Sequence, residues 1–267
     1  MMTLVLAVTF LTLPQQDSGQ QARRSVYHIR PSVDVPITVG TSLALLLPYL
    51  SSGRLIKPRC PCDPREVNAF DRAAIGNKSA VAKSLSDATV GAVIIAPLIL
   101  DALDVGRREP WIEDAVVFAQ TLAVNGALVT AAKFLVQRPL PRTYAGDPSL
   151  IDRPEGYRSF YSGHTSLAFA GLAASAMTIR LRHGERTWPW IVTGLVGTSV
   201  AVERVADGRH FPTDVITAAL MGSAVGIAVP ALHAHGRGGH GGLVIEPTSR
   251  GLVLGFTQPF CAFAELL

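Results

Sequence analysis

Long apolar stretches constrain the fold of this chain more than any other feature. One such stretch, from Ala115 to Ala132, has eighteen residues and no charge. A strand seldom exceeds about ten residues, so a stretch of this length predicts a helix. Five further stretches rich in Ala, Leu, Val and Gly cover residues 36–50, 88–100, 165–179, 187–202 and 215–232. Charged connections separate them, and the pattern predicts an all-α bundle of five to six apolar helices.

The composition favours a bundle embedded in a membrane. Of the 267 residues, 48% are hydrophobic and only 16% are charged, whereas soluble domains carry about 25% charged residues. So apolar a chain excludes intrinsic disorder. The alternative is a soluble all-α domain with unusually apolar core helices, because only residues 115–132 and 215–232 approach the roughly 20 residues that a spanning helix needs.

The two ends of the chain differ from its middle. An apolar run at residues 3–13 is followed by a polar stretch, which predicts a signal peptide or an N-terminal anchor within residues 1–20. Residues 236–267 form a Gly/His-rich linker and a tail, whose alternating pattern from Gly242 to Phe256 predicts a β-hairpin. The helical domain is therefore expected over residues 21–235.

Cysteines and net charge exclude several classes of protein. Three cysteines cannot form a disulfide scaffold. Cys60 and Cys62, separated by one proline, are expected not to bond each other, although one of them could pair with Cys261 in an oxidising compartment. No metal site is expected, and a scattered net charge of +4 gives no reason to expect a nucleic-acid partner.

Arginines in the connections predict the orientation of the bundle. Residues 106–109 and 180–186 are short connections rich in arginine, and both fall on one side of an alternating bundle. By the positive-inside rule that side is cytoplasmic, so residues 133–164 and 203–214 are expected to face outward. If residues 3–13 carry the chain outward, this parity requires that residues 36–50 do not span; otherwise residues 3–13 do not translocate the chain. We expect the first alternative, because residues 36–50 number only fifteen, and it leaves five spanning helices.

Three polar clusters stand at the outward ends of these helices, in residues 133–142, 159–166 and 203–214. Arginine side chains match phosphate oxygens in a bidentate manner. Backbone N–H groups at a helix N-terminus also bind anions. The clusters therefore predict an anion site, with the candidate ligands Lys133, Arg138 or Arg142, Ser162, Gly163 and Arg204.

The same clusters contain two imidazoles and a carboxylate suited to catalysis. His210 and Asp214 stand four residues apart and share one face of a helix that begins near them. A carboxylate that holds one imidazole nitrogen leaves the other free as a nucleophile or base. His164 is then a second imidazole for proton transfer.

At these residues the chain resembles the type-2 phosphatidic acid phosphatase superfamily, which includes bacterial acid phosphatases and vanadium haloperoxidases. The third motif of that family matches from Arg204 through His210 to Asp214, with Glu203 in place of a serine. The second motif matches at Ser162-Gly163-His164, with Tyr161 in place of a proline. The first motif matches at Lys133 and Pro141, but Leu140 stands where the family has an arginine.

The resemblance implies a metal-independent phosphatase without a cofactor, acting on a lipid phosphate or pyrophosphate monoester. His210 would form a phosphohistidine, Asp214 would hold His210, and His164 would serve as acid and then base. Lys133, Arg204, Ser162, Gly163 and either Arg138 or Arg142 would hold the phosphate oxygens. The expected location is a bacterial inner membrane, with the active site facing the periplasm.

Three alternatives remain open from the sequence. One is a soluble exported acid phosphatase of broad specificity in the periplasm, acting on small phosphate esters. Another is a vanadate-dependent haloperoxidase, because vanadate resembles the phosphoryl transition state. The last is a membrane protein that binds lipid without catalysis. The sequence does not identify the leaving group or the oligomeric state.

Overall fold

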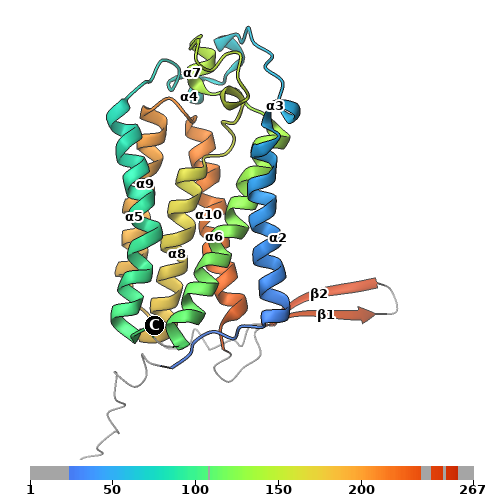
Figure 1. Ribbon diagram of the computed structural model, residues 1–267, viewed down its shortest axis with the longest axis vertical. Coiled ribbons are helices and arrows are strands. Elements are labelled where there is room, and N and C mark those ends of the chain that lie inside the picture. Colours follow the sequence, from blue (N-terminus) through green and yellow to red (C-terminus); the bar gives the residue numbers. More distant parts are fainter. Residues whose placement is uncertain (1–23, 108, 236–241, 249–250, 258–267) are drawn as a thin grey trace, which may run out of the picture.

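The computed structural model describes residues 24–107, 109–235, 242–248 and 251–257. Six long helices form one bundle and run along its long axis (Figure 1). They are α2 (Pro31–Leu50), α5 (Ala80–Val105), α6 (Glu109–Val136), α8 (Gly163–His183), α9 (Trp188–Ala206) and α10 (Pro212–His233). The predicted helical bundle is confirmed.

Short elements gather at one end of this bundle, at the top of Figure 1. They are the helices α3 (Ser52–Leu55), α4 (Ala69–Arg72) and α7 (Pro141–Tyr144), and the 3-10 turns η1 (Pro64–Glu66) and η2 (Pro154–Tyr157). Successive long helices alternate in direction, so the connections after α2, α6 and α9 all meet at this end. The three polar clusters of the sequence are thereby brought to one side of the molecule.

At the opposite end, the described start of the chain meets the end of α10. The backbone N–H of His28 donates to the carbonyl oxygen of His233 at 2.7 Å. Tyr27 and Ala234 form an isolated antiparallel bridge. Both ends of the helical domain therefore lie on the side away from the polar clusters.

The prediction of a short helix limited to residues 36–50 is wrong. The helix α2 begins five residues earlier, at Pro31, and has 20 residues. Pro31 suits the first turn, where no backbone N–H is needed, and the carboxylate of Asp34 accepts a hydrogen bond from the backbone N–H of Arg30 at 2.6 Å. The added turn makes α2 long enough to cross a bilayer.

The described residues include four segments long and apolar enough to cross a membrane: Pro31–Leu50, Ala80–Val105, Pro110–Tyr144 and Pro212–His233. Large apolar side chains cover the outside of the bundle. Leu103 on α5 is 77% exposed, Leu135 on α6 is 84% exposed and Leu195 on α9 is 69% exposed. Such a surface fits surrounding lipid and does not fit a soluble domain that hides its apolar helices in a core.

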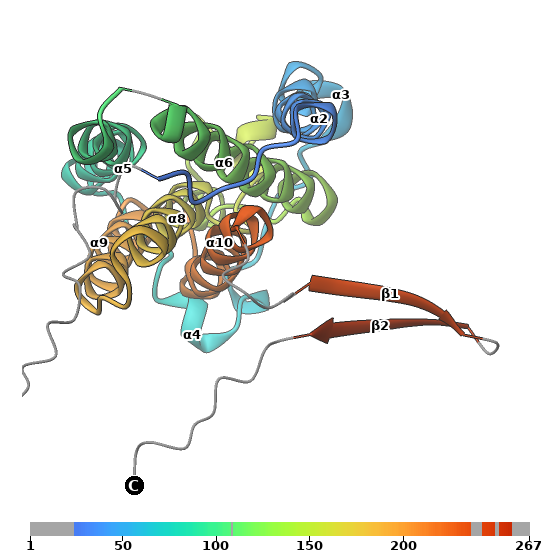
Figure 2. The same cartoon turned by 90° about the horizontal axis from the view of Figure 1, so that it is seen from below.

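The less apolar helix α8 lies in the middle of the bundle, between α5, α6, α9 and α10 (Figure 2). Its contact with α10 depends on glycine. A Cβ atom on Gly222 would lie 2.3 Å from the carbonyl oxygen of Ser166, and one on Gly226 would lie 2.5 Å from that of Ala170. This close approach sets the start of α8 beside the start of α10, where the second and third motifs lie.

The prediction that Cys60 and Cys62 do not bond each other is wrong. The two form a disulfide, with their Cα atoms 4.5 Å apart. This separation lies within the distance range that disulfides require. Cys261 lies outside the described residues.

The C-terminal hairpin is present as predicted. Strands β1 (Gly242–Thr248) and β2 (Gly251–Thr257) pair antiparallel, with Gly242 opposite Thr257. Residues 1–20, predicted as a signal peptide or anchor, and the Gly/His-rich residues 236–241 lie outside the described part of the chain.

Candidate active site

A cavity of about 610 Å³ reaches into the bundle from the end where the motifs meet. Its polar part is lined by Lys133, Arg158, His164, Arg204, Arg209 and His210. Its apolar part is lined from α2 by Leu45 and from α6 by Leu122 and Val129. The cavity therefore joins a strongly basic end to an apolar wall.

His210 stands in the tight connection between α9 and α10. Gly208 makes this connection with a φ of +70°, and a Cβ atom there would lie 2.0 Å from the carbonyl oxygen of Asn77. The imidazole is 5% exposed, and its Nδ1 lies 2.7 Å from the carbonyl oxygen of Ser159. Because a carbonyl only accepts hydrogen bonds, Nδ1 carries the proton and Nε2 is left unprotonated. Burial also lowers the pKa of His210 to about 3, which keeps the ring neutral.

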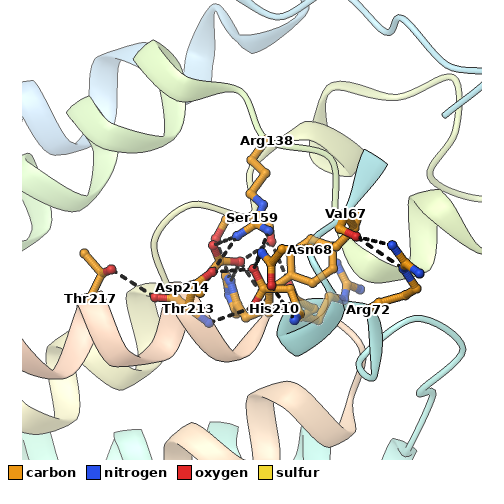
Figure 3. Close-up of polar contacts among 12 residues, drawn as sticks. Val67, Asn68, Arg72, Arg138, Ser159, His210, Thr213, Asp214 and Thr217 are labelled. Atoms are coloured by element: carbon orange, nitrogen blue, oxygen red, sulfur yellow. Dashed lines mark hydrogen bonds and ion pairs between the residues drawn. The ribbon is translucent and has the colours of Figure 1, made fainter. Parts of the chain in front are cut away.

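Asp214 belongs to the same network, although it does not hold the imidazole by a direct hydrogen bond. Its Oδ2 lies 3.9 Å from Nδ1 of His210. That oxygen accepts from the hydroxyl of Ser159 at 2.5 Å and from the backbone N–H of Phe211 at 2.9 Å. Asp214 therefore fixes Ser159, and the carbonyl of Ser159 orients His210 (Figure 3).

Arg138 lies behind this network and does not line the cavity. One guanidinium nitrogen lies 2.6 Å from Oδ1 of Asp214 and the other lies 2.7 Å from Oδ2 of Asp71 (Figure 3). The guanidinium also stacks 4.0 Å from the ring centroid of Phe211. Although burial opposes it, hydrogen bonds from Arg138 and Thr213 lower the pKa of Asp71. Both carboxylates are therefore ionised partners of Arg138.

Arg142 is also directed away from the cavity lining. Its Nε donates to Oδ2 of Asp147 at 2.9 Å. Hydrogen bonds from Ser149, together with Arg142, lower the pKa of Asp147. Arg138 and Arg142 were the two candidates for the incomplete first motif. Both have carboxylate partners, and neither lines the cavity.

Lys133 and Arg204 lie where the sequence predicts them, in the cavity lining. The ammonium of Lys133 donates to the carbonyl oxygen of Arg158 at 2.6 Å. One guanidinium nitrogen of Arg204 lies 3.1 Å from the hydroxyl of Ser86 and 3.1 Å from Oδ2 of Asp207. Both cations retain further donors that these contacts do not use.

Ser162 and Gly163 have different positions relative to the cavity. The hydroxyl of Ser162 caps α8 by accepting from the backbone N–H of Thr165 at 3.4 Å, and its own N–H donates to the carbonyl oxygen of Asp214 at 3.3 Å. Ser162 therefore ties α8 to α10 and is not among the residues that line the cavity. Gly163 does line it, at the N-terminus of α8.

His164 lines the cavity next to Gly163 and has a carboxylate partner that sequence reasoning missed. Its Nε2 lies 2.9 Å from Oδ1 of Asp87 on α5. Asp87 stands one residue before the apolar stretch 88–100, at the end of α5 that reaches the site. That position, a carboxylate at the site end of an apolar helix, is the signal that could have identified it.

Arg158 and Arg209 are two further cavity residues absent from the sequence-based set. Each directly precedes a residue of the hydrogen-bond network around His210, since Arg158 comes before Ser159 and Arg209 before His210. Asp71, the second partner of Arg138, is the fourth residue that the sequence analysis omitted. It lies in the connection between α2 and α5, and no motif marks it.

Comparisons with known proteins show which family the region of these motifs is similar to. Residues 114–236 match the model of the PAP2 superfamily. The chain is 33% identical over 129 residues to a lipid A 1-phosphatase from Porphyromonas gingivalis. It is 37% identical over 84 residues to a probable diacylglycerol pyrophosphate phosphatase 1 from Schizosaccharomyces pombe. These alignments cover 48% and 28% of this chain, but only 24% and 30% of the two relatives.

Two solved structures are also similar. Aquifex aeolicus LpxE matches with a TM-score of 0.43 and 25% identity, over 59% of this chain and 90% of that one. A transmembrane PAP2-type phosphatidylglycerolphosphate phosphatase from Bacillus subtilis matches with a TM-score of 0.46 and 17% identity, over 75% and 94%. The matched family region contains all three motifs, from Lys133 to Asp214. This chain is therefore similar to the PAP2 superfamily over residues 114–236, just under half of its length.

Proposed function

We propose that this chain is a membrane-embedded phosphatase that hydrolyses a phosphate or pyrophosphate monoester of a lipid. One observation carries the proposal. His210 is a buried, neutral imidazole whose Nδ1–H is held by Ser159, at the wall of a cavity lined by Lys133, Arg158, Arg204 and Arg209. An unprotonated imidazole nitrogen among fixed cations is suited to attack phosphorus.

In the first step, Nε2 of His210 attacks the phosphorus in line with the ester oxygen. The N–P bond forms and the P–O bond to the leaving group breaks. Protonated His164 donates its proton to the leaving oxygen, which departs as an alcohol or as a phosphate. The positive charge that develops on His210 is balanced by Asp214, 3.9 Å from Nδ1.

In the second step, neutral His164 takes a proton from a water molecule that attacks the phosphohistidine. The O–P bond forms, the N–P bond breaks, and inorganic phosphate leaves with His210 restored. The hydrogen bond that Nε2 of His164 donates to Oδ1 of Asp87 at 2.9 Å orients the imidazole in both steps. Asp87 is therefore a positioning residue in this scheme.

Fixed positive charge supplies most of the catalytic effect. The phosphoryl group spreads its negative charge over three oxygens in the transition state, so catalysis depends mainly on positioning and on charge stabilisation. Lys133 and Arg204 line the cavity close to His210, and the backbone of Gly163 adds the N-terminus of α8. The reaction uses groups that the chain itself supplies.

The apolar wall of the cavity favours a lipid as the substrate. Leu45 on α2 and Leu122 and Val129 on α6 continue the cavity from its basic end into the apolar part of the bundle. The two curated relatives are named for lipid A and for diacylglycerol pyrophosphate. A phosphate at the basic end and an acyl chain along this wall would satisfy both parts of the cavity.

We propose that the site faces the periplasm of a bacterium. The arginine-rich connection between α8 and α9 lies at the opposite end, which is the cytoplasmic side by the positive-inside rule. The Cys60–Cys62 disulfide, at the site end, suits an oxidising compartment. In this arrangement α2 also crosses the membrane, so the described start of the chain lies on the cytoplasmic side. We therefore do not propose that residues 1–20 export the chain.

Phosphate release by the purified protein in detergent tests the proposal. A panel of lipid phosphates, lipid pyrophosphates and small phosphate esters is compared, with and without a chelator. We expect release from the lipid esters that persists with the chelator and is lost in His210→Ala. The control His183→Ala removes an imidazole at the opposite end, 2.8 Å from Asp104, and is expected to retain activity. Full activity in a folded His210→Ala protein refutes the assignment.

A further inference from the structure

The cavity wall is apolar where the first motif of the resembled family has an arginine. Leu140 lines the cavity and is 3% exposed. Arg138 and Arg142, on either side of it, have carboxylate partners outside the cavity. A phosphoryl group with charge on three oxygens therefore needs a cation from elsewhere in the chain.

Arg209 has the side chain best placed to provide this charge. It lines the cavity directly before His210. Its Nε is buried and has no hydrogen-bond partner among the described residues, and the nearest recorded carboxylate oxygen, Oδ2 of Asp207, is 4.0 Å away. A buried donor without a partner is costly, and an anion in the cavity would satisfy it.

Arg158 approaches the cavity from the connection between α6 and α8. The ammonium of Lys133 holds its carbonyl oxygen at 2.6 Å, which fixes the backbone at this point. Its guanidinium lies 5.0 Å from the ring centroid of Tyr49 on α2 and 3.4 Å from Oε1 of Glu155, whose side chain is 45% exposed. The ion pair between Arg158 and Glu155 is long and partly exposed, so most N–H donors of the guanidinium remain available to a ligand.

We infer that Arg209 and Arg158 bind the phosphoryl oxygens of the substrate in place of the arginine absent at position 140. The inference rests on the proposed function and names two ligands of the same site. Arg209 occupies a spacer position of the third motif, and Arg158 lies before the second motif. Arg209 acts beside the nucleophile, and Arg158 acts at the mouth, where α2 meets the connection before α8.

Charge-removing variants test this assignment. Arg209→Gln and Arg158→Gln are compared with Arg153→Gln, which removes the same charge from an exposed residue of the same connection outside the cavity. By analogy with the loss of one oxyanion donor, we expect kcat/KM to fall about 10²–10³-fold in Arg209→Gln. We expect a smaller fall, mainly through KM, in Arg158→Gln, and none in the control. Arg209→Lys keeps the charge and is expected to retain more activity than Arg209→Gln.

Binding measured without turnover separates this inference from the proposed function. Calorimetric titration with orthovanadate reports oxyanion affinity whether or not a substrate has been found. We expect weaker vanadate binding in both variants, and recovery when Leu140→Arg is added to Arg209→Gln. If the wild type binds vanadate through Arg209 but releases phosphate from no ester, the proposed function fails and this inference stands. If both variants bind vanadate and turn over like Arg153→Gln, the inference is overturned.

Discussion

Replacement of Arg138 by methionine separates a structural role from a phosphate-binding role. Arg138 bridges Asp71 and Asp214, whose side chains are fully buried, while its own is 21% exposed. Methionine fills a similar volume without charge and leaves two buried carboxylates without their cation. Removal of one partner from a buried ion pair costs about 3–5 kcal/mol.

The remaining contacts place the expected loss at the lower end of that range. Asp71 still accepts from the backbone N–H of Thr213 at 2.9 Å and from the amide of Asn68 at 2.8 Å. Asp214 still accepts from Ser159 and Phe211. We therefore expect a loss of about 3 kcal/mol, equivalent to a fall of roughly 6–12 °C in Tm for a domain of this size.

The assay is thermal unfolding in detergent, followed by tryptophan fluorescence. The pKa of Asp71 is lowered in the fold, so the ion pair contributes fully at neutral pH and is lost as the pH falls through that lowered pKa. The deficit of Arg138→Met should accordingly shrink below about pH 4, where carboxylates protonate. Arg138→Met/Asp71→Asn should recover part of the loss, because one unpaired charge is removed. A variant with wild-type Tm and weakened phosphate binding would refute this reasoning and restore the role predicted from the sequence.

Three further predictions follow from the same geometry. Burial lowers the pKa of His210 to about 3, so the unfolded chain binds an extra proton between about pH 6.5 and 3. As the pH falls through that window, the free energy of unfolding should fall by up to about 1.4 kcal/mol per pH unit, and Tm should fall with it; parallel Tm–pH curves for wild type and His210→Gln would contradict this. Asp87→Asn should lower kcat and alter the pH dependence of kcat. The control Asp104→Asn removes the carboxylate partner of His183 at the other end of the bundle and should do neither. If Asp87→Asn has the same kcat–pH profile as the wild type, Asp87 does not position His164. Gly222→Ala should destabilise the bundle by about 1–3 kcal/mol in the same unfolding assay, while Gly194→Ala, with open space around it, should not; equal Tm values would disprove the close α8–α10 contact.

Sequence patterns predicted the bundle well because helix length and alternation follow from local composition. Six apolar stretches became six helices, and parity brought the motifs to one end. The start of α2 was missed because its first six residues include two prolines and an aspartate, which interrupt an apolar pattern and disfavour the prediction of a helix. The disulfide was missed because the separation in sequence does not reveal the backbone conformation that sets the two Cα atoms 4.5 Å apart.

The site was predicted only where a motif fixed the spacing. Lys133, His164, Arg204 and His210 all line one cavity, as residues of one anion site must. The direction of the Arg138 side chain depends on its ion pair with Asp71, which is distant in sequence and lies in no motif. Tertiary partners of this kind decide whether an arginine neutralises a buried carboxylate or faces a substrate, and local spacing carries no information on them.

The central claim is that His210 becomes covalently phosphorylated during turnover. Rapid acid-free quenching of the enzyme with a ³²P-labelled substrate, followed by peptide mapping, measures this directly. The account predicts a label that is stable to alkali, labile to acid and located on His210, and that accumulates in His164→Ala when the leaving group needs no proton. Steady turnover with no labelled enzyme, or a label on another residue, would contradict it.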